Sequence, residues 1–210
     1  MREQKERKSN GIYKQQHGGL HQTQSESFWA ENTRNRQNHS HCVVGQCTAE
    51  GLGDWFAKSS TQASSNYGID KNGRVGLYVE EKNRSWCSSS GANDQRAVTI
   101  ECASDTSEPY AMNSAVYATL IKLCVDICKR NGKKKLIWFG DKDKTLNYSP
   151  KSDEMILTVH RWFANKSCPG NWLYARLGDL ASKVTAQLGG AASTPAGGSQ
   201  TPVSKFPAVP

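Results

Sequence analysis

Short stretches of apolar residues, some continuous and some alternating with polar residues, predict the strands of this chain. They fall at residues 41–45, in two runs of 63–79 on either side of a polar turn, and at 95–103, 134–139 and 156–160. The second and third stretches flank Lys71-Asn72-Gly73, and an Asn-Gly pair is the strongest short-range signal for a hairpin turn. We therefore expect residues 63–79 to contain a β-hairpin, with the other stretches as separate strands.

Three segments instead carry apolar residues at helical spacing. The clearest is 112–131, in which Val116, Leu120, Leu123, Cys124 and Ile127 recur on one face. Asn113 or Ser114 can cap its start, and Asn131-Gly132 can end it. Residues 48–57, with Thr48 as a possible N-cap, and residues 172–188 are predicted as two further helices.

The two ends of the chain have a different composition. Residues 1–40 are rich in Gln, Asn, Ser and Arg without a sustained period, which favours a disordered arm. A buried strand that ends at His41 should be preceded by apolar residues, yet 35–40 supplies none; a reading-frame slip in the gene is one hypothesis for this. Residues 189–210 have linker composition. We therefore predict a globular domain over 41–188, followed by a linker.

The composition indicates in which cellular compartment the chain is made and which class of partner it binds. The chain has 210 residues, seven cysteines and a net charge of +8, with neither an apolar leader nor a long apolar run. An odd number of cysteines in a reducing cytoplasm indicates free thiols plus a metal ligand. The charge suits an anionic partner. Since no basic stripe with interleaved aromatics occurs, we expect neither a nucleic-acid partner nor a membrane span, and a monomer.

A candidate metal site lies in the segment HRWFANKSCPG, residues 160–170. His160 and Cys168 are of the types that bind zinc, and Lys166 stands two residues before the cysteine. A catalytic zinc site needs a third protein ligand, and His41 at the end of its strand is the obvious one. His39 shares that strand face, so either histidine can serve.

This segment resembles the C-terminal signature of the zinc-dependent N-acetylmuramoyl-L-alanine amidases of the peptidoglycan-recognition type. Segments 41–45, 63–79, 83–88 and 95–103 resemble the family in the same order, so that the resemblance spans roughly 41–188. Phage endolysins are the members it most resembles. The resemblance implies an α/β fold, with a central mixed sheet of five or six strands flanked by helices and a groove across its end. It also favours His41 as the ligand.

The implied chemistry is hydrolysis of the amide between N-acetylmuramic acid and L-alanine in bacterial peptidoglycan. Zinc on His41, His160 and Cys168 lowers the pKa of its water toward 7 and polarises the carbonyl. The resemblance makes Glu101 the general base, while Lys166 and Tyr67 are candidates to stabilise the oxyanion. Substrate contacts are expected at the groove residues Trp86 and Asn93. An enzyme of this kind, made without a signal peptide, reaches the wall after holin-type release. The resemblance also implies that 41–188 is the catalytic domain and that 189–210 is a linker cut off from a wall-binding domain.

Two alternatives remain open from the sequence. A cysteine endopeptidase of peptidoglycan would use Cys87 as nucleophile and His160 as base. A non-catalytic module of the same fold would bind peptidoglycan without cleaving it. Sensitivity to chelators separates the zinc enzyme from the peptidase, and loss of Cys168 or Lys166 would have favoured the binding module.

Overall fold

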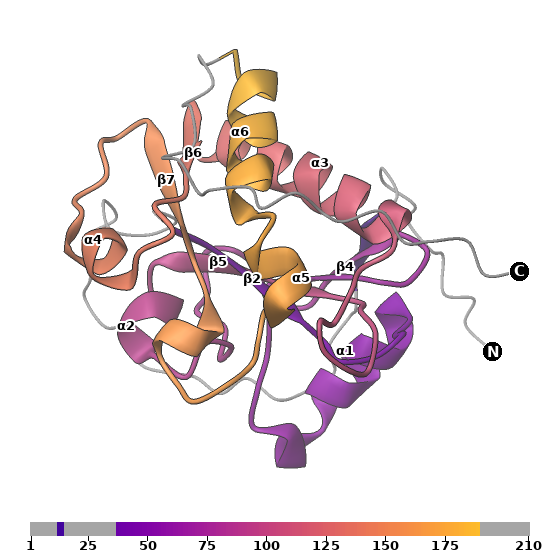
Figure 1. The fold of residues 1–210 in the computed structure, drawn as a ribbon. Helices are drawn as coiled ribbons and strands as arrows, with labels where there is room; N and C mark the ends of the chain where they lie inside the picture. Colours follow the sequence, from indigo (N-terminus) through magenta and orange to yellow (C-terminus); the bar gives the residue numbers. More distant parts are fainter. Residues whose placement is uncertain (1–11, 15–36, 190–210) are drawn as a thin grey trace, which may run out of the picture.

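A computed structural model describes residues 12–14 and 37–189, which form a sheet with helices packed around it (Figure 1). The sheet has seven strands in the order β1-β4-β3-β5-β2-β7-β6. Neighbouring strands run parallel except for β3 and β4. The strands are β1 (Ile12–Lys14), β2 (Gln37–Cys42), β3 (Tyr67–Ile69), β4 (Val75–Leu77), β5 (Ala97–Cys102), β6 (Lys135–Ile137) and β7 (Glu154–Thr158). The predicted mixed sheet is confirmed, with β1 as an additional edge strand.

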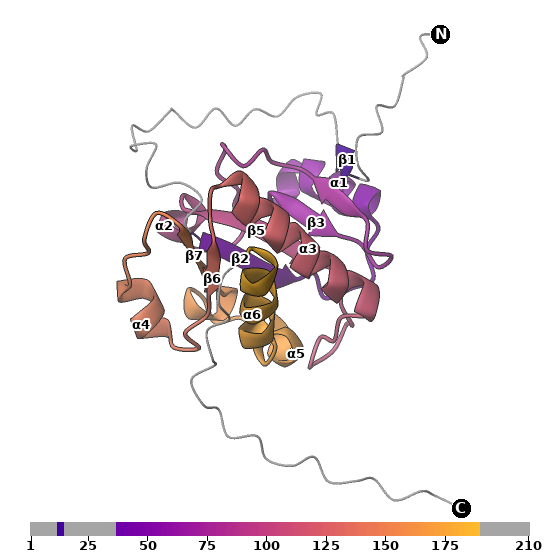
Figure 2. The ribbon, with the colours of Figure 1, turned by 90° about the horizontal axis from the view of Figure 1, so that it is seen from above.

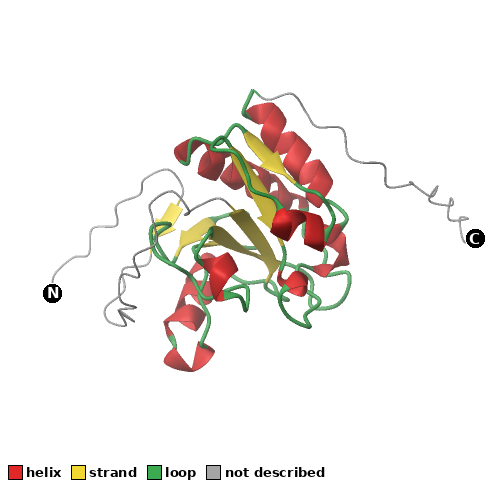
Figure 3. Ribbon diagram, turned by 90° about the vertical axis from the view of Figure 1, so that its left-hand side faces the viewer, coloured by secondary structure: helices red, strands yellow, loops and turns green. Residues whose placement is uncertain are grey.

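Helices cover both faces of this sheet (Figure 3). They are α1 (Ala49–Ala57), α2 (Gly91–Asp94), α3 (Ser114–Arg130), α4 (Lys142–Asn147), α5 (Gly170–Tyr174) and α6 (Leu177–Gln187), with short 3-10 turns η2 (Ser59–Thr61) and η3 (His160–Trp162). The two longest, α3 and α6, lie side by side on one face (Figure 2), and α1 packs near β3 and β4. Among the described residues, none of the helices has the length and hydrophobicity of a transmembrane span.

The local signals in the sequence form as expected. The side chain of Thr48 caps α1 by accepting from the Gly51 N–H, and that of Asn113 caps α3 by accepting from Val116. The hairpin turn is held by Asp70, whose carboxylate accepts from the backbone of residues 72 and 74. Gly73 has a φ of 79°, a conformation that glycine adopts at low cost.

Three predicted elements differ from those observed. The strand predicted at 41–45 is observed as β2, Gln37–Cys42, so that residues 37–40, predicted as part of a disordered arm, belong to the sheet. The single helix predicted over 172–188 is divided into α5 and α6, with Ala175 and Arg176 between them. The Trp172 N–H donates to the carbonyl of Pro109, which holds α5 on that loop, whereas α6 packs on β6 and α3. Residues 140–150, whose polar sequence predicts a loop, contain α4, and the side chain of Asp141 caps its first turn.

The central strand β2 is polar and nevertheless buried. Asn38, His39, Ser40 and His41 are each at most 2% exposed. Hydrogen bonds replace the apolar contacts expected there: the Asn38 amide points to the Cys124 thiol on α3, and the Ser40 hydroxyl donates to Asn38. The strand forms beside β5 and β7 with its polar sequence. The frame-slip hypothesis concerns the gene and stays a prediction that its nucleotide sequence tests; most of residues 1–36, and 190–210, lie outside the described residues.

Candidate functional site

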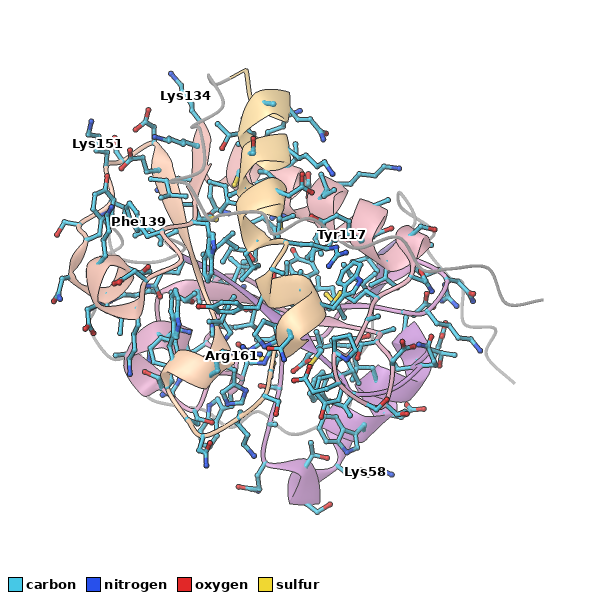
Figure 4. The ribbon with its side chains drawn as sticks, viewed as in Figure 1. Lys58, Tyr117, Lys134, Phe139, Lys151 and Arg161 are labelled. Atoms are coloured by element: carbon cyan, nitrogen blue, oxygen red, sulfur yellow. The ribbon has the colours of Figure 1, made fainter. Side chains whose placement is uncertain are left out.

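The segment between His160 and Cys168 forms a closed loop directly after β7. The backbone N–H of Arg161 donates to the carbonyl of Cys168 at 3.1 Å, and the N–H of Phe163 donates to that of His160 at 2.9 Å. The guanidinium of Arg161, labelled in Figure 4, donates to Asn171 on α5 and stacks over Tyr174. These contacts bring the side chains of His160 and Cys168 to the same end of the sheet.

His41 reaches this loop from β2, the strand beside β7. Its Nδ1 lies 3.1 Å from the Cys168 Sγ, and its ring centroid lies 4.9 Å from that of His160. One ligand atom from each of the three residues lies within 4.8 Å of the others. Ligands of a tetrahedral zinc ion at ordinary bond lengths are about 3.3–3.8 Å apart, so this donor set fits zinc with little rearrangement.

Burial sets the protonation states that a metal site requires. It lowers the pKa of His41 well below its ordinary value and also lowers that of His160. Neutral imidazoles are the form that binds metal. Burial raises the pKa of the Cys168 thiol, so the thiolate would be stable there only beside a cation. The hydroxyl of Ser89 lies 2.8 Å from Nε2 of His160, a contact that orients the ring.

Glu101 stands beside the three candidate ligands. The parallel pairing of β2 and β5 puts it in register with His41, and its Oε1 lies 3.7 Å from the histidine Nδ1. Burial raises the pKa of Glu101 to about 7, although a hydrogen bond from Cys87 acts in the opposite direction. Its Oε2 is buried without a partner among the described residues. A carboxyl group with a pKa near neutrality is suited to accept and return a proton.

A cavity of about 520 Å³ opens over these side chains, a volume usual for small-molecule sites. Lys166 and Trp86 both line it. Beyond them the wall includes Trp55, which is 47% exposed, and Arg84, whose guanidinium lies over the Trp86 ring. The sequence analysis missed Trp55 because its helical position gave no reason to separate it from ordinary packing residues.

A second layer of polar side chains lies under the candidate ligands. The His39 Nδ1 lies 2.7 Å from the Thr158 hydroxyl, which donates to the Asn93 side chain at 2.9 Å. His39 is fully buried and does not line the cavity, so the structure favours His41 over His39 as ligand. Asn93 is 3% exposed and belongs to this layer. The structure does not bring it to the cavity, contrary to its expected contact with substrate.

Tyr67 is placed on the other face of the sheet from Glu101. Strand β3 pairs with β5 so that Gly68 is in register with Glu101, and successive side chains of a strand point to opposite faces. The Tyr67 hydroxyl donates to Glu81 at 2.8 Å and lies near Arg130 on α3. Its predicted role at the oxyanion is therefore corrected to a structural one.

Cys87 has no histidine among its hydrogen-bond partners in the described structure. Its thiol contacts the carboxylate of Glu101 at 3.6 Å, and burial raises its pKa well above the ordinary value. A nucleophilic cysteine needs the opposite, a pKa lowered by a cationic neighbour. This environment disfavours the alternative of a cysteine endopeptidase.

Comparisons with known proteins agree with this geometry. The Amidase_2 family model, described as N-acetylmuramoyl-L-alanine amidase, matches residues 16–171. Among solved structures, the amidase LysC from Clostridium intestinale is 14% identical, with a TM-score of 0.53 over 85% of this chain and 97% of its own. A mutant endolysin from Bacillus subtilis is 11% identical, with a TM-score of 0.54 over 82% and 97%.

A third structure is the hydrolase AmiA of Staphylococcus aureus in complex with its ligand. It is 13% identical, with a TM-score of 0.53 and 88% of each chain covered. At such low identities these structures show a shared fold. No curated protein sequence matches the chain.

Proposed function

The chain belongs to the N-acetylmuramoyl-L-alanine amidase family, and we propose that it cleaves its substrate with a zinc ion held by His41, His160 and Cys168. The bond is the amide that joins the lactyl group of N-acetylmuramic acid to the L-alanine of the stem peptide. One observation carries the proposal. Three zinc-binding side chains from β2 and the loop after β7 converge within 4.8 Å at the floor of the cavity.

A zinc ion in this site would supply Lewis-acid polarisation of the scissile carbonyl and activation of water. Glu101 takes a proton from the attacking water and delivers it to the nitrogen of the leaving alanine. Its position beside His41 and its pKa of about 7 support this role, because the same group must act first as a base and then as an acid.

Lys166 supplies a positive charge where negative charge develops on the carbonyl oxygen. It lines the cavity, and its charge contributes to the lowered pKa of His160, which follows from their proximity. The ammonium group is exposed to solvent before substrate enters. Substrate that fills the cavity would exclude water around it, and one such donor contributes on the order of 3 kcal/mol to transition-state stabilisation.

The cavity wall around Trp86 and Trp55 is suited to the muramoyl-peptide. Both rings are exposed, at 36% and 47%, and aromatic faces of this kind contact the apolar face of a sugar or peptide. We place the protein at the bacterial cell wall, which it would reach by release through a holin-type pore, and we expect it to act as a monomer.

Product analysis on purified Gram-positive cell walls tests this function. The amidase should release new N-terminal alanine, lose this activity with a chelator and regain it with zinc. Cys168→Ala should abolish the release, whereas Cys47→Ala, a half-buried cysteine outside the cavity, should not. New reducing sugar ends, or N-termini other than alanine, would contradict the assigned bond. Wall binding without any product would favour a non-catalytic module.

A further inference from the structure

A second set of metal-binding atoms lies immediately beside the first. It consists of Cys87, Glu101 and His41, and one ligand atom of each lies within 4.8 Å of the others. The Cys87 Sγ is 3.6 Å from the Glu101 Oε1, which is 3.7 Å from the His41 Nδ1. The proposed catalytic set explains His41 and the nearby Glu101. It leaves unexplained why a thiol faces the carboxylate.

We propose that Cys87 and Glu101 form a second, inhibitory binding site for a thiophilic divalent cation. This second site is adjacent to the zinc held by His41, His160 and Cys168. A thiol and a carboxylate are both established zinc donors, and the sulfur increases the preference for zinc or cadmium over magnesium or calcium. The Nδ1 of His41 can bind one ion at a time. The second site therefore depends on Cys87 and Glu101, with solvent completing the coordination of the cation.

An unpartnered oxygen of Glu101 supports a ligand role for this side chain. The Glu101 Oε2 is buried without a partner among the described residues, an arrangement that a carboxylate ligand to a cation would resolve. Cys87 and Glu101 line the same cavity as the catalytic set, so an ion can enter by the route that substrate uses. As the Cys87 sulfur bonds to the cation, the thiol proton passes to solvent, and no oxidant or reductant is needed.

A cation bound at this second site would stop catalysis, because it would coordinate the Glu101 carboxylate that accepts the proton from water. This consequence rests on the proposed function. Zinc should therefore activate the enzyme at about one equivalent and inhibit it in excess, as a second ion binds beside the first. Cadmium, which binds thiolates more strongly, should inhibit the zinc-loaded enzyme at lower concentrations.

The experiment compares the full chain with Cys87→Ser and with Cys47→Ser. Each protein is loaded with one equivalent of zinc, and its activity on cell walls is taken as its own reference. Zinc or cadmium is then added in steps. We expect the half-inhibiting concentration to rise about tenfold or more in Cys87→Ser, since loss of one ligand worth 1.4 kcal/mol gives this factor. Cys47→Ser should behave as the unmodified chain.

A direct measurement of binding makes the result independent of activity. The ultraviolet charge-transfer band of cadmium–thiolate bonds, recorded during titration, should show a step that Cys87→Ser removes and Cys47→Ser keeps. Identical inhibition curves and identical titrations in all three proteins would overturn the proposal of a second site. If the unmodified chain shows no activity with one equivalent of zinc, the proposed function fails. The cadmium titration still decides whether the second site exists.

Discussion

His39 and Thr158 are in register on the neighbouring strands β2 and β7, and their side chains are joined by a hydrogen bond of 2.7 Å between Nδ1 and Oγ1. Each stands two residues before a proposed zinc ligand, His41 and His160 respectively. Since alternate residues of a strand share a face, His39 lies beneath His41, and their ring centroids are 4.4 Å apart. His160 follows the end of β7, in the turn η3. Asn93, bonded to both, ties α2 to the same layer.

This buried histidine should make the protein sensitive to acid. Burial lowers the pKa of His39 from 6.5 to about 3, so below pH 6.5 the unfolded chain binds a proton that the folded chain does not. Each pH unit below this value should cost up to about 1.4 kcal/mol of folding stability, whereas above it the residue has no pH effect. Denaturant unfolding of the chain and of His39→Val at pH 7 and pH 5 measures this loss of folding stability.

We expect the loss of stability between these two pH values to be smaller in His39→Val by about 1–2 kcal/mol. Subtracting one protein from the other removes the contribution of other titrating groups, including the proposed zinc ligands. An equal loss in both proteins would show that His39 does not cause the acid sensitivity.

The polarity of β2 is also where sequence patterns failed. Periodicity predicted the hairpin, α3 and the strand that carries Glu101, because these depend on local spacing. A polar strand at the centre of a sheet is satisfied only by partners far along the chain, such as Cys124 and Thr158, which no local pattern reveals. The failed placement of Tyr67 has a similar origin, because the face of a three-residue strand depends on its register with β5.

Tyr67 provides a test of that corrected placement. Tyr67→Phe removes the hydroxyl bonded to Glu81 and keeps the ring in the core. We expect a loss of about 1 kcal/mol in unfolding free energy and the same activity on cell walls. A fall in kcat of tenfold or more with unchanged stability would return Tyr67 to the catalytic groups.

Glu101→Gln separates proton transfer from metal binding. The amide is close in shape to the carboxylate and cannot accept the proton from water. We expect kcat to fall by about 10²–10⁴-fold, while zinc content remains that of the unmodified chain. A variant that loses its zinc along with its activity would indicate that Glu101 is mainly a ligand.

Lys166 is tested by its charge. Lys166→Met should lower kcat by about 10²-fold with little change in KM, because the ammonium acts on charge that exists only in the transition state. Lys166→Arg, which keeps the charge, should retain more activity. If Lys166→Met leaves kcat unchanged, the residue is an ordinary exposed lysine of the loop.

The convergence of His41, His160 and Cys168 on one zinc ion is tested most directly by the zinc content of purified variants. The unmodified chain and His39→Val should each bind about one equivalent after dialysis, whereas His41→Ala and Cys168→Ala should retain almost none. Circular dichroism confirms that each variant is folded. Zinc bound equally by all four proteins, or lost from His39→Val and kept by His41→Ala, would contradict the proposed site.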